Sequence, residues 1–139
     1  MLVLVTAHHS ERELARKVAL RLRMAIPLPT THRVKAADGR VAPDFVTTLD
    51  AADRTLLLVT PSSTSLRTAQ RLLKFTSGIG VGVDRVLVVA HGFRDEKRMS
   101  VRELGDLLER EIFWELASDD APEEVQDRSY RDLAAKLGL

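Results

Sequence analysis

The first pattern along the chain is a series of short apolar runs separated by longer segments of mixed polarity. Continuous runs of Val and Leu predict strands that are buried on both faces, as in a parallel sheet. Three runs have this character and a fourth is less regular: LVLVT (2–6), TLLLVT (55–60), RVLVVA (85–90) and EIFWEL (111–116). The stretch 25–42, which contains Pro27 and Pro29, has no such run and predicts a hairpin or an irregular loop.

The segments between the runs have the spacing of amphipathic helices. In 10–24 the apolar residues recur every three or four positions, and Ser10 with Glu13 forms a capping box at the start. Ser100 with Glu103 marks a second helix start in the same way. The predicted helices are 10–24, 43–52, 63–76, 100–110 and 129–139.

This alternation of strands and helices defines the expected fold class. Buried strands that alternate with amphipathic helices predict an α/β protein with a doubly wound, mainly parallel sheet flanked by helices. Helices on both faces of the sheet give a three-layer α/β/α sandwich. A length of 139 residues fits a single domain, 1–139.

Composition narrows the classes of function. The chain has no cysteine, which excludes disulfides, thiol catalysis and thiolate metal sites and fits a cytoplasmic location. No apolar run approaches about 18 residues, so no membrane span is expected, and the start lacks the layout of a signal peptide. Only 4% of the residues are aromatic, so there is no strong signal for stacking on nucleic-acid bases.

The net charge of +1 conceals a gradient along the chain. Residues 1–41 carry eight basic and three acidic residues, whereas residues 100–139 carry eleven acidic and five basic ones. Such a gradient either steers self-association or partner docking, or reflects two solvated helical faces.

Polar segments follow the predicted strands and are expected at one edge of the sheet, because ligands in such folds bind beyond the carboxyl ends of the strands. One of Ser62, Ser63 and Thr64 is expected to cap the helix that begins there. No serine lies in a G-x-S-x-G pattern, so no catalytic residue is assigned. The residues predicted for a ligand or partner face are His8, His9, Ser10, Pro61, Ser62, Ser63, His91, Gly92 and Arg94.

Three histidines at this edge suggest an alternative. His8 and His9 follow the first strand and His91 follows RVLVVA. In the strand order implied by the family resemblance described below, these two strands are neighbours, which would bring three imidazoles together near Asp95, Asp119 or Asp120. Such a donor set suits zinc or a similar divalent metal. In the competing interpretation, the histidines serve as turn and capping residues.

Two local patterns give further expectations. The segment SGIGVGVDR (77–85) precedes a strand, so we interpret it as a helix C-cap and loop with Gly78 or Gly80 at positive φ. Phe113 and Trp114 are adjacent in a predicted strand. Either one faces the core while the other is exposed as a contact residue, or both are buried on opposite faces of the sheet.

From residue 45 onward the chain resembles the MinD/ParA family of P-loop ATPases, and most of all the pilus-assembly branch typified by CpaE. The similar segments are TLDAADRTLLLVTPSSTSLRTAQRLLKF (48–75), GVDRVLVVAHGF (82–93), MSVRELGDLLEREIFWELASDD (99–120) and YRDLAAKLGL (130–139). The resemblance implies the α/β sandwich, protein partners, a homodimer across the strand-end face and a role in positioning or assembling a larger bacterial machine.

The sequence departs from this family where the nucleotide would be held. A phosphate loop needs glycines that let backbone N–H groups surround phosphate and a lysine that reaches the β- and γ-phosphates. Here AHHSERE (7–13) has neither glycine nor lysine, and it places Glu11 and Glu13 near the helix N-terminus. The family has an asparagine that contacts adenine after the third strand, and here Ala90 or His91 stands at that position. We therefore interpret the chain as a reduced member, without ATP hydrolysis.

A second resemblance concerns LVVAHGFRDE (87–96), which is similar to the VAHGSRD start of sirohydrochlorin chelatases. In that family the histidine helps to hold the metal, which would give His91 this role. Phe93 replaces the serine of that motif, and the motif lies deep in this chain.

The leading hypothesis is a non-hydrolysing MinD/ParA-like interaction module that requires no cofactor. One alternative is a nucleotide-binding switch without a standard phosphate loop, in which the helix N-termini at Ser10 and Ser63 would bind ATP. The other is a metal-binding, chelatase-like enzyme that uses His8, His9 and His91.

Overall fold

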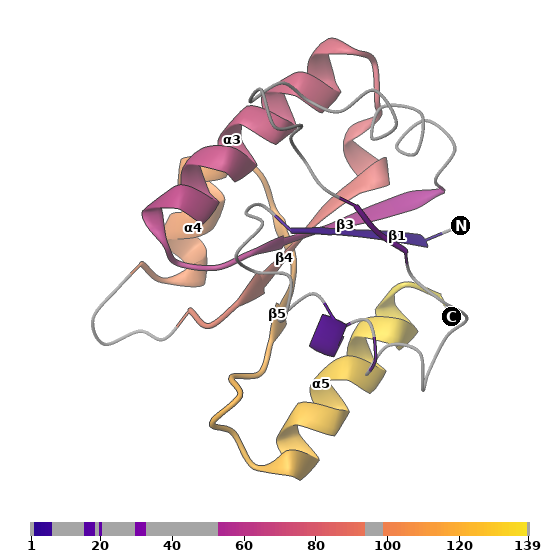
Figure 1. The fold of residues 1–139 in the computed structure, drawn as a ribbon, viewed down its shortest axis with the longest axis vertical. Coiled ribbons are helices and arrows are strands. Elements are labelled where there is room, and N and C mark those ends of the chain that lie inside the picture. The colour runs from indigo at the N-terminus through magenta and orange to yellow at the C-terminus, as the bar shows by residue number, and fades with distance from the viewer. Residues whose placement is uncertain are drawn as a thin grey trace.

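The computed structural model describes residues 2–6, 16–18, 20, 30–32, 53–93 and 99–138. Within these residues five strands form one sheet in the order β2-β1-β3-β4-β5, and every neighbouring pair is parallel (Figure 1). The strands are β1 (Leu2–Thr6), β2 (Thr30–His32), β3 (Arg54–Val59), β4 (Val86–His91) and β5 (Ile112–Leu116). The helices are α3 (Ser63–Gly78), α4 (Val101–Leu108) and α5 (Glu123–Lys136), with a 3-10 turn η2 (Val83–Arg85).

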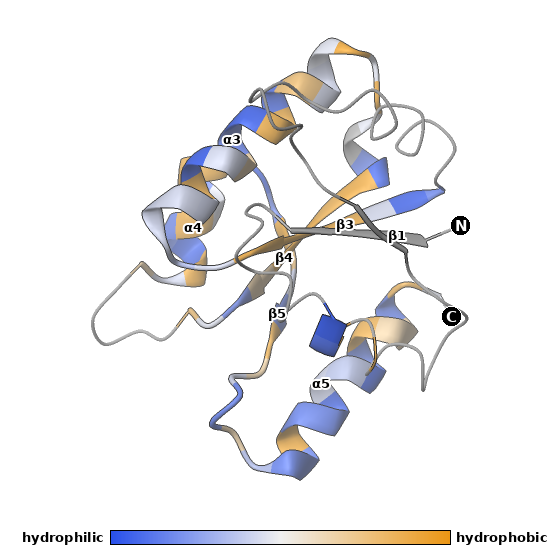
Figure 2. Ribbon diagram, viewed as in Figure 1, coloured by the Kyte–Doolittle hydropathy of each residue, from blue (hydrophilic) through white to orange (hydrophobic). Residues whose placement is uncertain are grey.

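The helices cover both faces of the sheet, which confirms the predicted α/β sandwich. Helices α3 and α4 lie on one face and α5 lies on the other (Figure 1). Alternate residues of β3 point to opposite layers, so Leu57 packs with α3 and α4 while Leu56 and Leu58 pack with α5. Strands β3 and β4 are correspondingly hydrophobic along most of their length (Figure 2). These are the fully buried strands that their continuous apolar runs predicted.

The order of the strands corrects the expectation that the first strand neighbours RVLVVA. Strand β3 pairs with both β1 and β4 and therefore lies between them. Strands that are buried on both faces have similar apolar sequences. Their sequences therefore do not show which of them are adjacent in the sheet. The chain order reverses between β1 and β3, and this switch point is where folds of this type leave a crevice for ligands.

A short edge strand replaces part of the loop or hairpin expected in 25–42. Strand β2 has three residues, Thr30–His32, and pairs with β1 in parallel. Pattern analysis missed it because three residues are too few to establish a periodicity. The β-branched Thr30 and Thr31 were the available signal, since such residues favour strands.

Helix α5 begins six residues earlier than the predicted start at 129. Pro122 is its N-cap residue, and Glu123 and Glu124 occupy the first turn. Acidic residues favour a helix N-terminus because they interact with its partial positive charge. The prediction rested on Leu133 and Leu137, which lie four positions apart near the end of the helix, whereas the first half of α5 contains a single buried residue, Gln126.

The pair Phe113 and Trp114 follows neither of the predicted arrangements. The register between β4 and β5 shifts after Val88, which pairs with Ile112, so that Val89 pairs with Trp114 and Phe113 is the extra residue. An extra residue of this kind interrupts the alternation of side chains along a strand. Both rings are consequently half-buried against the α5 side of the core.

The local predictions at helix ends are confirmed where the structure describes them. Ser100 caps α4 by accepting a hydrogen bond from the N–H of Glu103, and Gly80 has a φ of 84° after α3. Predicted helix 43–52 lies outside the described residues, and of 10–24 the described residues 16–18 and 20 are helical. No described helix is long and apolar enough to cross a membrane.

Candidate functional site

The candidate site is the edge formed by the carboxyl ends of the strands. Of the nine residues predicted for this face, Pro61, Ser62 and Ser63 follow β3, while His91 ends β4 and Gly92 follows it. A third described segment, 117–122, follows β5. The other predicted members, His8, His9, Ser10 and Arg94, lie outside the described residues.

The hydroxyl-rich turn after β3 bonds to itself. Ser62 is the N-cap of α3, and its Oγ accepts a hydrogen bond from the N–H of Ser65 at 3.1 Å. The buried Oγ of Ser65 accepts a hydrogen bond from the N–H of Thr60 at 3.0 Å. Of the three capping candidates, Ser62 takes the role, because it is the last residue with extended backbone before the helix. These hydroxyls therefore shape the turn between strand and helix.

The turn after β4 lies beside the turn after β3. Gly92 has a φ of 78°, and a Cβ atom built on it would lie 3.7 Å from Cδ of Pro61. The next residue, Phe93, is only 5% exposed and belongs to the core between the sheet and α3 and α4. Phe93, which replaces the serine of the chelatase motif in LVVAHGFRDE, is therefore a core residue.

His91 is buried at the end of β4 and faces a carboxylate. Its Nε2 lies 3.6 Å from Oδ1 of Asp119, which also has Nζ of Lys17 3.4 Å from its Oδ2. No described residue offers Nε2 a hydrogen-bond partner. Burial lowers the pKa of His91 below its usual 6.5; Asp119 opposes this shift and Lys17 adds to it. The three side chains link β4, the turn after β5 and the helical residues 16–18.

Folding stability is expected to fall on acidification because of His91. Its pKa is lower in the folded protein, so below about pH 6.5 the unfolded chain takes up a proton that the folded chain refuses. The stability present above that pH is therefore lost as the pH falls toward the lowered pKa. Urea unfolding between pH 7.5 and 5.5 should show a smaller loss for His91→Gln than for the wild type. Equal losses in both proteins would contradict this assignment.

The turn after β5 is held by two residues that pattern analysis missed. Nε2 of the buried Gln126 donates hydrogen bonds to the carbonyl oxygens of Asp119 and Ala121, at 3.0 and 2.8 Å. Oγ of Ser129 accepts a hydrogen bond from the N–H of Ala117, and its carbonyl oxygen accepts one from Nε1 of Trp114. The only signal for Gln126 in the sequence was that it is a polar residue at a position on the buried side of α5.

The structure does not support the predicted convergence of histidines. Because β3 separates β1 from β4, His91 does not lie at the end of a strand that neighbours β1. Among the described residues, no group of three or more His, Asp or Glu side chains could hold a metal ion. The pair His91 and Asp119 alone provides fewer ligands than the three that a catalytic zinc site uses.

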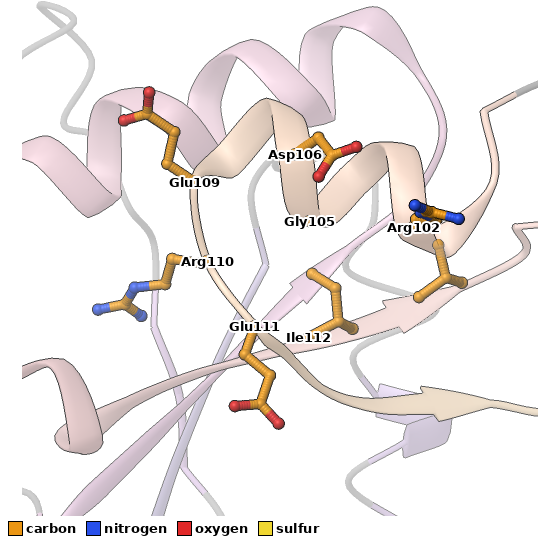
Figure 3. Close-up of a pocket in the computed structure, with 8 residues that line it drawn as sticks. Arg102, Gly105, Asp106, Glu109, Arg110, Glu111 and Ile112 are labelled. Atoms are coloured by element: carbon orange, nitrogen blue, oxygen red, sulfur yellow. The ribbon is translucent and has the colours of Figure 1, made fainter.

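Two hollows adjoin β5, one at each of its ends. The hollow at the carboxyl end measures about 360 Å³ and lies among Phe93, Trp114, Leu116 and Val125. The other measures about 690 Å³ and lies at the start of β5 beneath α4, away from the candidate site. Figure 3 shows it lined by residues of both charges, with Gly105 above Ile112. Neither hollow receives the hydroxyl groups of the turn after β3.

The fold can now be compared with known proteins. No protein-family model and no curated protein matches the sequence. Among solved structures, a ParA family ATPase from Chlorobium tepidum TLS superposes with a TM-score of 0.62 at 20% identity, over 78% of this chain and 49% of that one. The chain thus spans about half the length of that ATPase.

Two structures from Aquifex aeolicus give the same result. MinD in the MinC:MinD cell division protein complex superposes with a TM-score of 0.59, and MinD alone with 0.57. Both are 14% identical to this chain, over 99% of it and 83% of MinD. The chain therefore has the MinD/ParA-type fold that its segments from residue 45 onward resemble.

Proposed function

We propose that this protein is a non-hydrolysing interaction module with a MinD/ParA-type fold, which binds protein partners and forms a homodimer across the strand-end edge. The observation that carries the proposal is the turn after β3, at the switch point of the sheet. The side chains of Ser62 and Ser65 accept hydrogen bonds from backbone N–H groups of that same turn. Hydroxyls used in this way hold the backbone of the turn between strand and helix.

The sequence that follows β1 along the chain supports the same conclusion. AHHSERE (7–13) has no glycine to bring the backbone close to phosphate and no lysine to neutralise it. Its acidic residues Glu11 and Glu13 would repel a nucleotide. His91, where the resemblance leads us to expect an adenine contact, is buried, and its charged form is disfavoured. In the proposed role, the protein therefore acts by binding other proteins through its surface and does not bind a nucleotide.

The nature of the partner is inferred from similarity. The MinD neighbour is itself a cell division protein seen in complex with MinC, another protein. The resemblance to the CpaE branch adds the expectation that this chain helps to position or assemble a bacterial machine, such as a pilus, a secretion system or a polar complex.

Absence of nucleotide binding is tested by thermal unfolding with ATP–magnesium, GTP–magnesium, zinc, cobalt or nickel. A ligand present at about 100 times its Kd would stabilise the folded state by about 2.7 kcal/mol, a shift of several degrees. We expect no shift with any of these additions. A shift with a nucleotide would establish the switch alternative. A metal-dependent shift that His91→Ala abolishes would establish the metal alternative.

The proposed dimer is tested by light scattering on two matched variants of α3. Ser63 is exposed at the strand-end edge, and Ser77 is exposed at the opposite end of the same helix. We expect Ser63→Arg to convert the dimer to a monomer, because a bulky charge would enter the contact, and Ser77→Arg to leave the dimer intact. A wild-type monomer, or equal effects of the two changes, would contradict a dimer across this edge.

A further inference from the structure

The outer face of α3 carries three cations and no acidic residue. Arg67, Arg71 and Lys74 are exposed and lie four and three positions apart, which places them on one side of the helix. None of the 16 residues of α3 is acidic. No ion pair within the described part of the chain involves these three cations. We call them the α3 cation face.

A surface of the opposite charge lies on the other layer of the sandwich. Segment 117–127 runs from the end of β5 into α5, and it contains five acidic residues and no basic one. Among these, Asp119, Asp120, Glu123 and Glu124 are exposed. Nζ of Lys17 lies 3.4 Å from Oδ2 of Asp119. We call 117–127 the acidic segment.

Each charged surface has exposed apolar side chains beside it. Leu107 of α4 is 37% exposed, and its carbonyl oxygen accepts a hydrogen bond from Gln70, which lies between the cations of α3. Val125 within the acidic segment is 45% exposed and lines the 360 Å³ hollow together with Trp114. Interfaces commonly combine an apolar centre with a polar rim. Each surface therefore combines charge with one exposed apolar side chain nearby.

We propose that the α3 cation face of one copy binds the acidic segment of a second copy of this chain. Helix α3 and the start of α5 cover opposite faces of the sheet (Figure 1). The contact is consequently heterologous, and it leaves one unused surface on each copy, so that copies add head to tail. The acidic segment begins at the strand-end edge, whereas the α3 cation face lies along the outer side of α3. This contact therefore pairs two different surfaces, unlike the proposed dimer, which pairs two strand-end edges, and the inference does not depend on that dimer.

The overall charge favours a second copy over a nucleic acid as the occupant. A nucleic-acid-binding domain of this size typically has a pI above about 9, whereas this chain has a pI of about 8.2 and a net charge of +1. A net charge close to zero also leaves little repulsion between copies. The chain itself supplies the complementary surface.

The test is sedimentation velocity of the purified protein between 50 and 500 mM salt. Attraction between exposed charges weakens as salt screens it. We expect the wild type to form species larger than its basal unit at about 50 mM salt and to lose them at about 500 mM. Reversal of two cations in Arg67→Glu/Arg71→Glu should weaken the association at least about tenfold, because like charges would then meet.

The matched control reverses two arginines of α5 outside the acidic segment. Arg128→Glu/Arg131→Glu changes the net charge by the same amount, but it makes the α5 side more acidic and should preserve or strengthen the association. A third variant, Asp120→Lys/Glu124→Lys, should lose association alone and regain it when mixed with Arg67→Glu/Arg71→Glu. Circular dichroism checks that each variant is folded.

Three results would overturn the proposal. The first is a wild type that sediments as one species at every salt concentration. The second is equal weakening by the reversals on α3 and on α5, which would show an effect of net charge alone. The third is a basal wild type that binds a fluorescent 20-base-pair DNA through the α3 cation face, which would assign these cations to a nucleic acid.

Discussion

Replacement of Leu104 by alanine is expected to lower the free energy of unfolding by about 3 kcal/mol. Leu104 is fully buried, and it anchors α4 to the sheet within the core that also contains Leu57 and Phe93. Removal of its branched end loses transfer free energy and leaves a cavity that the neighbouring strand and helix fill only in part. Urea denaturation monitored by circular dichroism measures the change.

Leu107 provides the control within the same helix. It has the same side chain but is 37% exposed, so Leu107→Ala should cost well under half as much as Leu104→Ala. Both substitutions place alanine in the same helix, which removes differences of helix propensity from the comparison. Equal losses would mean that α4 packs on the sheet with a different face.

Replacement of Gly92 by valine is expected to destabilise the protein by about 1–2 kcal/mol. The φ of 78° at Gly92 is costly for a residue with a Cβ atom, and most costly for a β-branched one. The new side chain would also contact Pro61, because its Cβ atom would lie 3.7 Å from Cδ of Pro61. We expect the strain to loosen the contact between the turns after β3 and β4. Urea denaturation again measures the loss.

Two further variants separate the effect of backbone strain at Gly92 from the effect of steric contact with Pro61. Asparagine tolerates left-handed backbone better than valine does, so Gly92→Asn should cost clearly less. Gly78 lies at the end of α3 with an ordinary φ and open space around it, so Gly78→Val should be almost neutral. If Gly92→Val were as mild as Gly78→Val, the left-handed turn would not constrain this edge.

At the candidate site, the sequence pattern predicted where residues lie but not what their side chains contact. The sequence places hydroxyls after TLLLVT and a histidine after RVLVVA, and both do lie at the strand-end edge. Whether a hydroxyl faces a ligand or its own backbone depends on hydrogen-bond geometry, which spacing does not specify. Ser62 and Ser65 turn toward the chain, and His91 turns toward Asp119, 28 positions later. Gln126, which holds the turn after β5, left no periodic signal.

The sequence by itself determined the α/β class, the strands β3 and β4 buried on both faces, the cap at Ser100, and a hydroxyl cap among residues 62–64. These features depend on residues that are close together in the chain, where periodicity and capping chemistry act directly. The tertiary structure alone decided that β3 separates β1 from β4, that β5 contains an extra residue at Phe113, and that α3 and the acidic segment lie on opposite layers. These features arise from pairing between segments that are distant in the chain. Sequences with the same local pattern can form such pairs in different ways, so the local pattern does not specify them.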